Sequence, residues 1–465
     1  MATNVVETID RSRMSGFQVR IVAICAAVLI VDGFDAQALG FAIPSLARDW
    51  GVEPSAFTLA ATVGVAGLLV GSLLVGALSD RWGRRPVTIA GLTVITLTMF
   101  LTAGVSSMAW LVVLRFFTSV AVGALTPNLI ALVSEYSPQR RRMFTVAVAI
   151  SGFALGGVIG GFLSAWLIPL VNWHGVFITG GILTLVTGAA VVLGVPESVR
   201  VLTMSGRQDA VRRIMSRITS PDEAASNDYV LVEERTARAS VAALFRQGRA
   251  LTTALVWLTF FMSLLVLYFG ANWLPTILDA AGFEPAFALI GTSIFNVAMV
   301  LGALLAGFSA DKVQRPAILI GAAFAGACLV FASLPLFAGT PMLLLVGLCV
   351  AGFFVQAGQA SLAAFAGGLY PTSIRATGLG WGFGAGRIGS VAGPLIGGVL
   401  IAANLGPVSI LALLAFPAAL AATAVGTVGL RRGAHVAEVG ASSAGAVHTS
   451  HGSELQGRAA VEEQS

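Results

Sequence analysis

The chain has 465 residues, of which 57% are hydrophobic and only 11% are charged, and its mean hydropathy is +0.89. Soluble domains carry roughly 25% charged residues, so this composition excludes a soluble globular protein and predicts a multi-pass membrane protein. The formal net charge of +5 is accounted for by basic loops on one side of the membrane, and no basis remains for a nucleic-acid partner.

Twelve apolar stretches have the length of about 20 residues that a helix needs to cross the hydrocarbon core of a bilayer. In chain order they are 18–46, 55–79, 86–105, 108–134, 143–168, 173–194, 250–275, 285–310, 316–337, 341–368, 375–403 and 407–430. The first is of spanning length and lacks a small-residue cleavage site at its end, so we expect it to remain as a helix. The sequence therefore predicts an all-α membrane protein with twelve transmembrane helices.

Basic residues indicate the orientation, because cytoplasmic loops are enriched in lysine and arginine. They fall on one side of an even-numbered bundle, at Arg11, Arg13, Arg20, Arg81, Arg84, Arg85, Arg140, Arg141, Arg142, Lys312, Arg315, Arg431 and Arg432. Among the loops on the other side, only the first carries a cation, Arg48, together with Asp49 and Glu53. We expect both termini to be cytoplasmic and the protein to lie in the inner, or plasma, membrane.

Polar stretches divide the chain into five expected parts. A cytoplasmic N-terminus (1–17) precedes an N-terminal six-helix bundle (18–194). A cytoplasmic linker rich in charged residues (195–249) leads to a C-terminal six-helix bundle (250–430). Residues 431–465 are small and polar, and they predict a disordered cytoplasmic tail.

The two bundles repeat the same landmarks. Residues Pro44, Gly51, Glu53, Pro54 and Asp80 are matched by Pro275, Gly282, Glu284, Pro285 and Asp311 at a constant spacing (275 − 44 = 231, 311 − 80 = 231). A glycine ladder at 152–161 returns at 389–398 with a slightly larger spacing (389 − 152 = 237). Two parallel six-helix repeats are typical of carriers whose halves rock about a central binding site.

Two aspartates, Asp32 and Asp35, lie inside the first span, in the segment V-D-G-F-D-A-Q at 31–37. An aspartate at the bilayer centre costs roughly 2.5 to 3.5 kcal/mol on insertion scales, which suggests that the pair has a function. Their spacing places both on one helix face that can look into the bundle interior. Their counterparts in the second half are Ser263 and Val266, so the acids are not part of the repeated architecture. A structural role, at a helix end or in assembly, is the alternative.

The sequence gives no indication of an enzyme. The three cysteines and four histidines have neither catalytic nor metal-ligating spacing, and no histidine lies within a span to relay protons. No nucleophile and base pair or phosphate-binding loop is present. We therefore expect neither catalysis nor a cofactor or bound metal.

The loop between spans two and three, G-A-L-S-D-R-W-G-R-R-P at 76–86, resembles the signature loop of the major facilitator superfamily, and a degenerate copy occurs at 307–316. The resemblance implies the major facilitator fold. Asp80 can pair with arginines across the cytoplasmic seam between the halves, as a latch that must break during transport. We expect gating roles for Asp80, Arg84, Arg85 and Asp311. A simple topology anchor is the alternative.

The segment 32–37 narrows the resemblance, because it is similar to the first-helix signature of the aromatic acid:H⁺ symporter family, which includes carriers of benzoate and 4-hydroxybenzoate. Further resembling residues are Arg115, Pro127-Asn128, Glu135-Tyr136-Ser137-Pro138, Pro196-Glu197-Ser198, Tyr370-Pro371, Arg375 and Arg387. In that family, acids of the first helix and arginines of the eleventh are linked to transport. The resemblance assigns those roles to Asp32, Asp35, Arg375 and Arg387.

The residue chemistry agrees with such a substrate. An aromatic carboxylate in a dry cavity needs a cation, and Arg387, whose counterpart in the other half is Ile150, offers a planar bidentate fork. Carboxyl groups in a low dielectric can exchange protons between two states, which favours Asp32 and Asp35 for proton coupling. Further substrate contacts are expected from polar and aromatic residues that can equally face lipid or bond between helices, namely Phe34, Gln37, Tyr268, Asn272, Trp273, Asn296, Gln356, Gln359 and Trp381.

Arg115 and Glu135 lie twenty positions apart, near opposite ends of span four, and cannot pair with each other on that helix. We expect them to serve helix packing or gating, with a direct role as the alternative.

The leading hypothesis is uptake of a small aromatic carboxylate driven by protons, carried out by a functional monomer in the lipid bilayer. One alternative is an H⁺-coupled efflux antiporter of the same fold, although antiporters usually carry proline where this chain has Gly157. Another is a transporter-like sensor, but no long cytoplasmic signalling domain accompanies the bundles. The sequence leaves open which aromatic acid is carried and how many protons accompany it.

Overall fold

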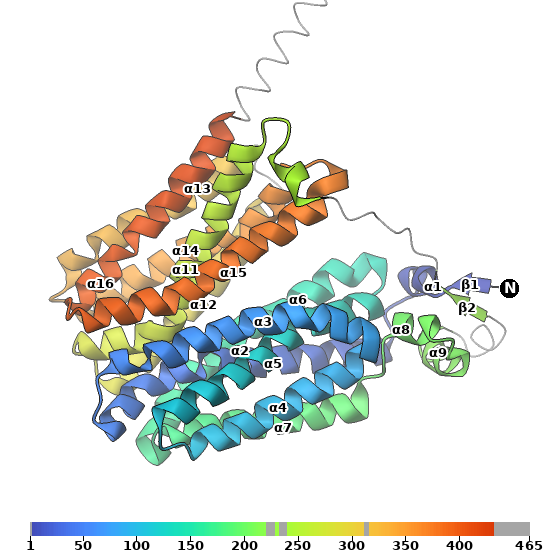
Figure 1. Ribbon diagram of the computed structural model, residues 1–465, viewed down its shortest axis with the longest axis horizontal. Coiled ribbons are helices and arrows are strands. Elements are labelled where there is room, and N and C mark those ends of the chain that lie inside the picture. The colour runs from blue at the N-terminus through green and yellow to red at the C-terminus, as the bar shows by residue number, and fades with distance from the viewer. Residues whose placement is uncertain (1, 220–227, 232–239, 311–315, 432–465) are drawn as a thin grey trace, which may run out of the picture.

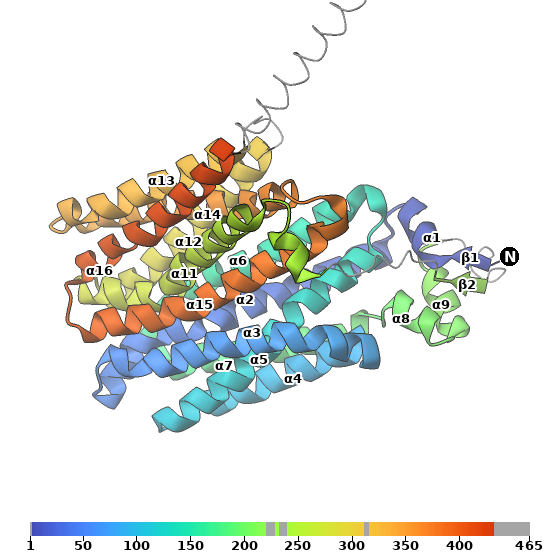
Figure 2. The same ribbon diagram turned by 45° about the horizontal axis from the view of Figure 1, so that its top comes forward.

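The computed structural model describes residues 2–219, 228–231, 240–310 and 316–431, which form a mainly helical molecule (Figures 1 and 2). Within these residues, twelve helices are long and apolar enough to cross a membrane, so the predicted number is confirmed. Six of these helices precede residue 195 and form an N-terminal half, and six follow residue 249 and form a C-terminal half. The halves lie side by side in both views.

The bounds of the elements are as follows. The N-terminal half contains α2 (Gly16–Trp50), η1 (Pro54–Phe57), α3 (Thr58–Trp82), α4 (Arg84–Ala103), α5 (Met108–Tyr136), α6 (Gln139–Val171) and α7 (His174–Gly194). The C-terminal half contains η2 (Val241–Phe245), α11 (Ala250–Ala280), α12 (Pro285–Ala310), α13 (Pro316–Ser333), η3 (Leu334–Phe337), α14 (Pro341–Gly367), α15 (Thr372–Ala402) and α16 (Pro407–Leu413).

Several helices are longer than the predicted spans. α2 begins at Gly16, where Ser15 and Gln18 form a capping box, and α6 begins at Gln139. Hydropathy does not detect such ends, because the capping residues of α2 and the first turn of α6, with Arg140, Arg141 and Arg142, are polar or charged. The last span is interrupted at Leu414 and resumes as helix at 415–431. Pro417 explains the interruption, since it lacks the N–H that would bond the carbonyl of the residue four positions earlier.

The repeat in the sequence is also a repeat in the structure. Gly51 ends α2 and Gly282 follows α11, and both have positive φ angles, 63° and 90°, that favour glycine. α2 packs against α6 as α11 packs against α15, and α3 packs against α5 as α12 packs against α14. The landmarks 231 residues apart therefore mark corresponding turns of two similar bundles.

The two halves contact each other near one end and diverge toward the other (Figure 1). We call the contacting end, which carries the connections 51–57 and 281–284, the distal end. There Gly161 of α6 lies against Ser293 of α12, and a Cβ at Gly161 would overlap the serine Oγ. Ile150 lies three turns earlier on the same face of α6 and is 49% exposed, so contact between the halves is lost toward the opposite, proximal end.

A small unit of short elements lies at the proximal end (Figure 1). It consists of β1 (Ala2–Asn4), α1 (Val5–Arg11), α8 (Val199–Met204), α9 (Gln208–Met215) and β2 (Asp228–Val230). β1 and β2 pair in parallel, which joins the N-terminal segment to the segment between the halves. Within the described residues, these two strands are the difference from the all-α structure that the sequence predicts. Of the predicted tail 431–465, only Arg431 lies within the described residues.

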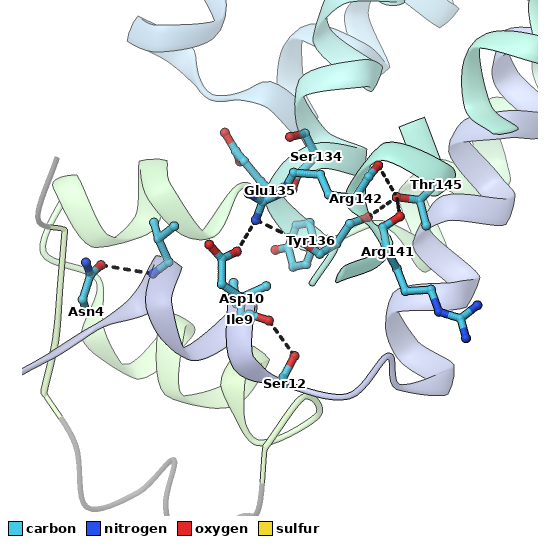
Figure 3. A network of polar contacts seen from close by, with 12 residues as sticks. Asn4, Ile9, Asp10, Ser12, Ser134, Glu135, Tyr136, Arg141, Arg142 and Thr145 are labelled. Carbon is cyan, nitrogen blue, oxygen red and sulfur yellow. Dashed lines mark hydrogen bonds and ion pairs between the residues drawn. The ribbon is translucent and has the colours of Figure 1, made fainter. Parts of the chain in front are cut away.

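Helix α1 is fixed against the ends of α5 and α6 (Figure 3). Val5 and Ile9 are buried, and Asp10 forms an ion pair with Arg142 of α6. The Arg142 Nε donates to the Ser134 carbonyl of α5 at 3.0 Å, so one guanidinium connects three helices. The N-terminus is therefore a packed element of the N-terminal half.

Candidate substrate and proton site

The aspartate pair lies in the middle of α2, where Asp32 is 2% and Asp35 1% exposed. Gly33 between them sets the packing of this segment, because a Cβ at Gly33 would overlap the Phe153 carbonyl oxygen of α6. Backbone cannot move aside as a side chain can. The glycine of the D-G-F-D segment therefore allows α6 to press directly on the turn of α2 that carries both acids.

This contact yields a stability prediction. Gly33→Ala is expected to destabilise the protein by about 1–3 kcal/mol, since overpacking against backbone forces the two helices apart. Gly16→Ala is a matched control at the start of the same helix, because a Cβ there meets nothing within 4 Å. Thermal unfolding in detergent would measure both. Equal melting temperatures for the two variants would contradict the proposed close approach.

The carboxylates bond to two different helices inside the N-terminal half. Asp32 Oδ2 accepts a hydrogen bond from Thr126 Oγ1 of α5 at 2.8 Å, and Asp35 Oδ2 accepts one from Thr184 Oγ1 of α7 at 3.1 Å. The Oδ1 atom of each aspartate is buried without a hydrogen bond among the described residues. Each acid thus retains an unsatisfied oxygen that can carry a proton.

Arg115 of α5 lies beside Asp35. It is 3% exposed, and its Nη2 donates to the backbone carbonyl of Asp35 at 3.0 Å. Its guanidinium also lies over the Phe177 ring, 5.9 Å from the ring centroid. The sequence predicts packing or gating for Arg115, with a direct role as the alternative, and the structure places it against the acid pair. Sequence alone did not reveal this, because residues eighty positions apart are brought together only by helix packing.

Thr126 and Thr184 were not singled out from the sequence. Threonine is common in apolar helices, where its hydroxyl usually bonds to the carbonyl one turn earlier. The hydroxyl of Thr184 makes both kinds of bond, since it bonds to Asp35 and also to the Gly180 carbonyl of its own helix at 2.8 Å. The position of Thr126 directly before the Pro127-Asn128 pair was the one available signal.

Arg387 in α15 is the candidate cation in the C-terminal half. Its Nη1 donates to Tyr268 Oη of α11 at 3.3 Å, so two predicted site residues lie together. No acidic side chain forms an ion pair with Arg387 within the described residues. Arg387 lies three turns before Gly398, on the face of α15 that contacts Thr58 of α3. The guanidinium therefore lies on the side of its half that faces the other half, and it is half-buried.

A second pair of predicted residues connects the halves. Asn296 Nδ2 of α12 donates to Gln37 Oε1 of α2 at 3.2 Å. Gly157 of α6 lies beneath this bond, and a Cβ at that position would overlap the Gln37 amide. The two amides thus meet between the halves, and Asp35 and Asp32 lie two and five residues earlier on α2, on the opposite face of the helix.

Two glutamines of α14 differ in their contacts. Gln359 Oε1 accepts a hydrogen bond from Ser263 of α11. Gln356 Oε1 is buried and has no hydrogen bond within the described part of the chain. Of the two, Gln356 is the one whose carbonyl remains available to a ligand.

Four of the predicted substrate contacts are used elsewhere. Phe34 packs against the glycines of α6 and α7, and the indole N–H of Trp273 donates to the Pro394 carbonyl at 2.9 Å. The Asn272 amide bonds back to the Tyr268 carbonyl of its own helix, and Trp381 is 48% exposed and stacks on Trp257. Their assignment to the substrate site stays a prediction, and these contacts show what holds each side chain in the described state.

The predicted gating residues gather at the proximal end of the N-terminal half. Arg84 pairs with Glu135 at 2.7 Å, and these side chains are 20% and 6% exposed. Arg85 donates to the Val192 carbonyl at 2.7 Å. Glu197, which the sequence marks only through the Pro196-Glu197-Ser198 motif, accepts the backbone N–H of Arg84 at 2.8 Å and stabilises the N-terminus of α4.

The structure says less about the other predicted gating residues. Arg375 is exposed at the start of α15, and Asp80 lies in α3 with a side chain outside the described residues. Asp311 also lies outside them. The predicted latch between Asp80 and arginines across the seam therefore stays a prediction, whereas Arg84 and Arg85 have partners inside their own half.

Comparison with known proteins agrees with this architecture. The family model of the Major Facilitator Superfamily matches residues 25–331 and 274–449. The chain is 36% identical to a gallate transporter of Pseudomonas putida over 91% of its length and 94% of that protein. It is 35% identical to the 4-hydroxybenzoate transporter PcaK of Acinetobacter baylyi, covering 90% of this chain and 92% of the relative. A benzoate transport protein of the same organism is 30% identical, with 92% and 93% covered.

The protein therefore belongs to the major facilitator superfamily and, within it, to the family of these aromatic acid transporters, as the sequence predicted. Among solved structures, a D-xylose-proton symporter superposes with a TM-score of 0.67 at 16% identity, covering 88% of this chain and 97% of that one. At that identity the similarity establishes the fold alone. The chain is a multi-pass membrane protein with the major facilitator fold.

Proposed function

We propose that this protein imports a small aromatic carboxylate together with protons, as a functional monomer in the inner, or plasma, membrane. The observation that carries the proposal is the unequal distribution of charge on a duplicated scaffold. One half holds Asp32 and Asp35, each with an unsatisfied oxygen, and the other holds Arg387 without an acidic partner among the described residues. The relatives named for gallate, 4-hydroxybenzoate and benzoate support the substrate class.

The proposed substrate contacts follow from these positions. The carboxylate binds the Arg387 guanidinium through two parallel hydrogen bonds, and the Tyr268 hydroxyl holds that guanidinium in place. Gln37 and Asn296, which bond to each other across the halves, contact the substrate when it displaces their bond. Gln356 offers a free carbonyl to a ring hydroxyl.

The orientation of the molecule in the membrane determines which end must open for import. Arg141 and Arg142 lie at the proximal end, where the halves diverge, and cytoplasmic ends are enriched in such residues. We therefore take the proximal end as cytoplasmic, with both termini inside, and the described state as the one open to the cytoplasm. Import then requires the distal contacts between the halves to separate, so that substrate and protons can enter from outside.

Uptake by purified protein tests the proposal. Proteoliposomes would receive labelled benzoate, 4-hydroxybenzoate, gallate or gentisate under an imposed inward proton gradient. We expect accumulation of at least one aromatic acid above its external concentration, and none of an uncharged aromatic of similar size. Failure to move any of these acids under either gradient direction would refute transport and favour a sensor.

A further inference from the structure

The distal contacts between the halves are related to one another by the internal repeat. Gly161 of α6 and Gly398 of α15 are counterparts at the 237 spacing (398 − 161 = 237). A Cβ at Gly161 would overlap Ser293 of α12 and lie 3.1 Å from the Leu289 carbonyl, and a Cβ at Gly398 would overlap Thr58 of α3. Thr58 and Leu289 are themselves counterparts at the 231 spacing. The two halves therefore touch through two equivalent glycine contacts.

An ion pair lies between the same ends. Arg48 Nη1 of α2 contacts both carboxylate oxygens of Asp279 of α11, at 2.9 and 3.1 Å. These two residues are also 231 positions apart, so they occupy equivalent positions in the two halves. A contact between equivalent positions lies on the pseudo-twofold axis that relates the repeats. The sequence predicts Arg48 as the one cation among the loops on that side of the membrane, and in the structure it lies in the last turn of α2 and pairs with Asp279.

We propose that Gly161 and Gly398 set the closed position of the distal end, with the Arg48–Asp279 pair as a latch on the axis between them. Glycine at both positions lets the helix pairs α6–α12 and α15–α3 approach until the outer entrance is shut. Any side chain there holds the halves apart and favours the state open to the outside. The inference rests on the alternating-access part of the proposed function, but it does not depend on the substrate or on proton coupling.

The ion pair and the glycine contacts differ in how strongly they hold the distal end closed. The ion pair is 51% exposed on the arginine side and 25% on the aspartate side, so water screens it and it contributes little to closure. The glycine contacts are made by packed helix surfaces, where an added methyl group forces displacement. The closed state of the distal end therefore depends mainly on the two glycine contacts. The Arg48–Asp279 pair makes a smaller contribution to how long that state lasts.

A thiol probe measures the opening directly. Phe41, Ala165 and Leu289 form a buried cluster that joins the halves at the distal end. In a variant with the three native cysteines replaced, Ala165→Cys would be labelled by a membrane-impermeant maleimide from outside only when the entrance opens. Gly161→Ala and Gly398→Ala are expected to raise the labelling rate about five- to 150-fold. Arg48→Ala is expected to raise it about fivefold at most.

The controls separate closure from general damage. Gly426→Ala in the last span should leave labelling unchanged, because a Cβ there meets nothing within 4 Å. Ser293→Ala added to Gly161→Ala should lower the labelling rate again in part, since it removes the overlapping oxygen but leaves the Leu289 carbonyl 3.1 Å from the new Cβ. The charge exchange Arg48→Asp with Asp279→Arg should restore the latch. Unchanged labelling in both glycine variants, or no rescue by Ser293→Ala, would overturn the proposal.

A second measurement covers the case in which the glycine variants do not fold. A bifunctional maleimide would bridge Arg48→Cys and Asp279→Cys in an otherwise cysteine-free protein. The bridge is expected to form readily, to block labelling of Ala165→Cys in the same background, and to arrest transport reversibly when a cleavable linker is cut. Absence of a bridge would refute the closed distal end. Because the labelling and bridging readouts use no substrate, failure of the proposed function would leave both results interpretable.

Discussion

Asp32→Asn is expected to abolish gradient-driven accumulation of the aromatic acid, with a loss of at least about a hundredfold in the accumulation ratio. Asparagine keeps the shape and can still accept the hydrogen bond from Thr126, so the packing of α2 against α5 is retained. What is lost is the ability to bind and release a proton. Equilibration of substrate down its own gradient should therefore survive, and this downhill exchange is the readout that separates lost coupling from lost folding.

Asp35→Asn is expected to have the same effect on accumulation and a larger effect on stability. Arg115 is buried beside Asp35, and a buried cation without a neighbouring acid is destabilising. Asp209→Asn, at an exposed position of α9, is the matched control for removing one acidic group. Full concentrative uptake in both the Asp32 and Asp35 variants, measured in proteoliposomes with an imposed pH gradient, would contradict the coupling role.

The second large effect is expected at the substrate cation. Arg387→Lys keeps the charge but loses the planar pair of donors, so the affinity for an aromatic carboxylate should fall about tenfold or more. Tyr268→Phe should weaken binding less, because it removes only the hydroxyl that holds the guanidinium. Calorimetric titration of the purified protein with 4-hydroxybenzoate would measure both.

Arg246→Lys provides the control for Arg387, since that arginine is exposed and directly follows η2. Its dissociation constant should match that of the unaltered protein. An unchanged affinity in Arg387→Lys would remove this residue from the site and would direct attention to Arg375 on the same helix.

The fold was largely predictable from the sequence because its determinants are local and periodic. Long apolar stretches have one stable solution in a bilayer, and the constant 231 spacing of Gly51 and Gly282 marks equivalent turns without any knowledge of contacts. Helix ends were less predictable, because caps such as Ser15 are polar. The pairing of β1 with β2 was not predictable, since three-residue strands far apart in sequence carry no periodic signal.

The candidate site was only partly predictable. Charge asymmetry between the halves identified Asp32, Asp35 and Arg387, because an uncompensated charge in a span is costly enough to be noticed. The surroundings of those charges depend on which helix faces meet, and the sequence does not encode this locally. The sequence therefore does not associate Arg115 and Thr184 with Asp35, nor the indole N–H of Trp273 with the Pro394 carbonyl.

The direction of coupling is the measurement that tests the account most directly. Oriented vesicles would be loaded with labelled aromatic acid on both sides and then given an acidic exterior. Symport driven by the acid pair and Arg387 predicts net entry that rises as the outer pH falls and collapses with a protonophore, because proton and carboxylate binding favour each other. Net loss of the preloaded acid under that same inward proton gradient would contradict import and leave an efflux antiporter of the same fold.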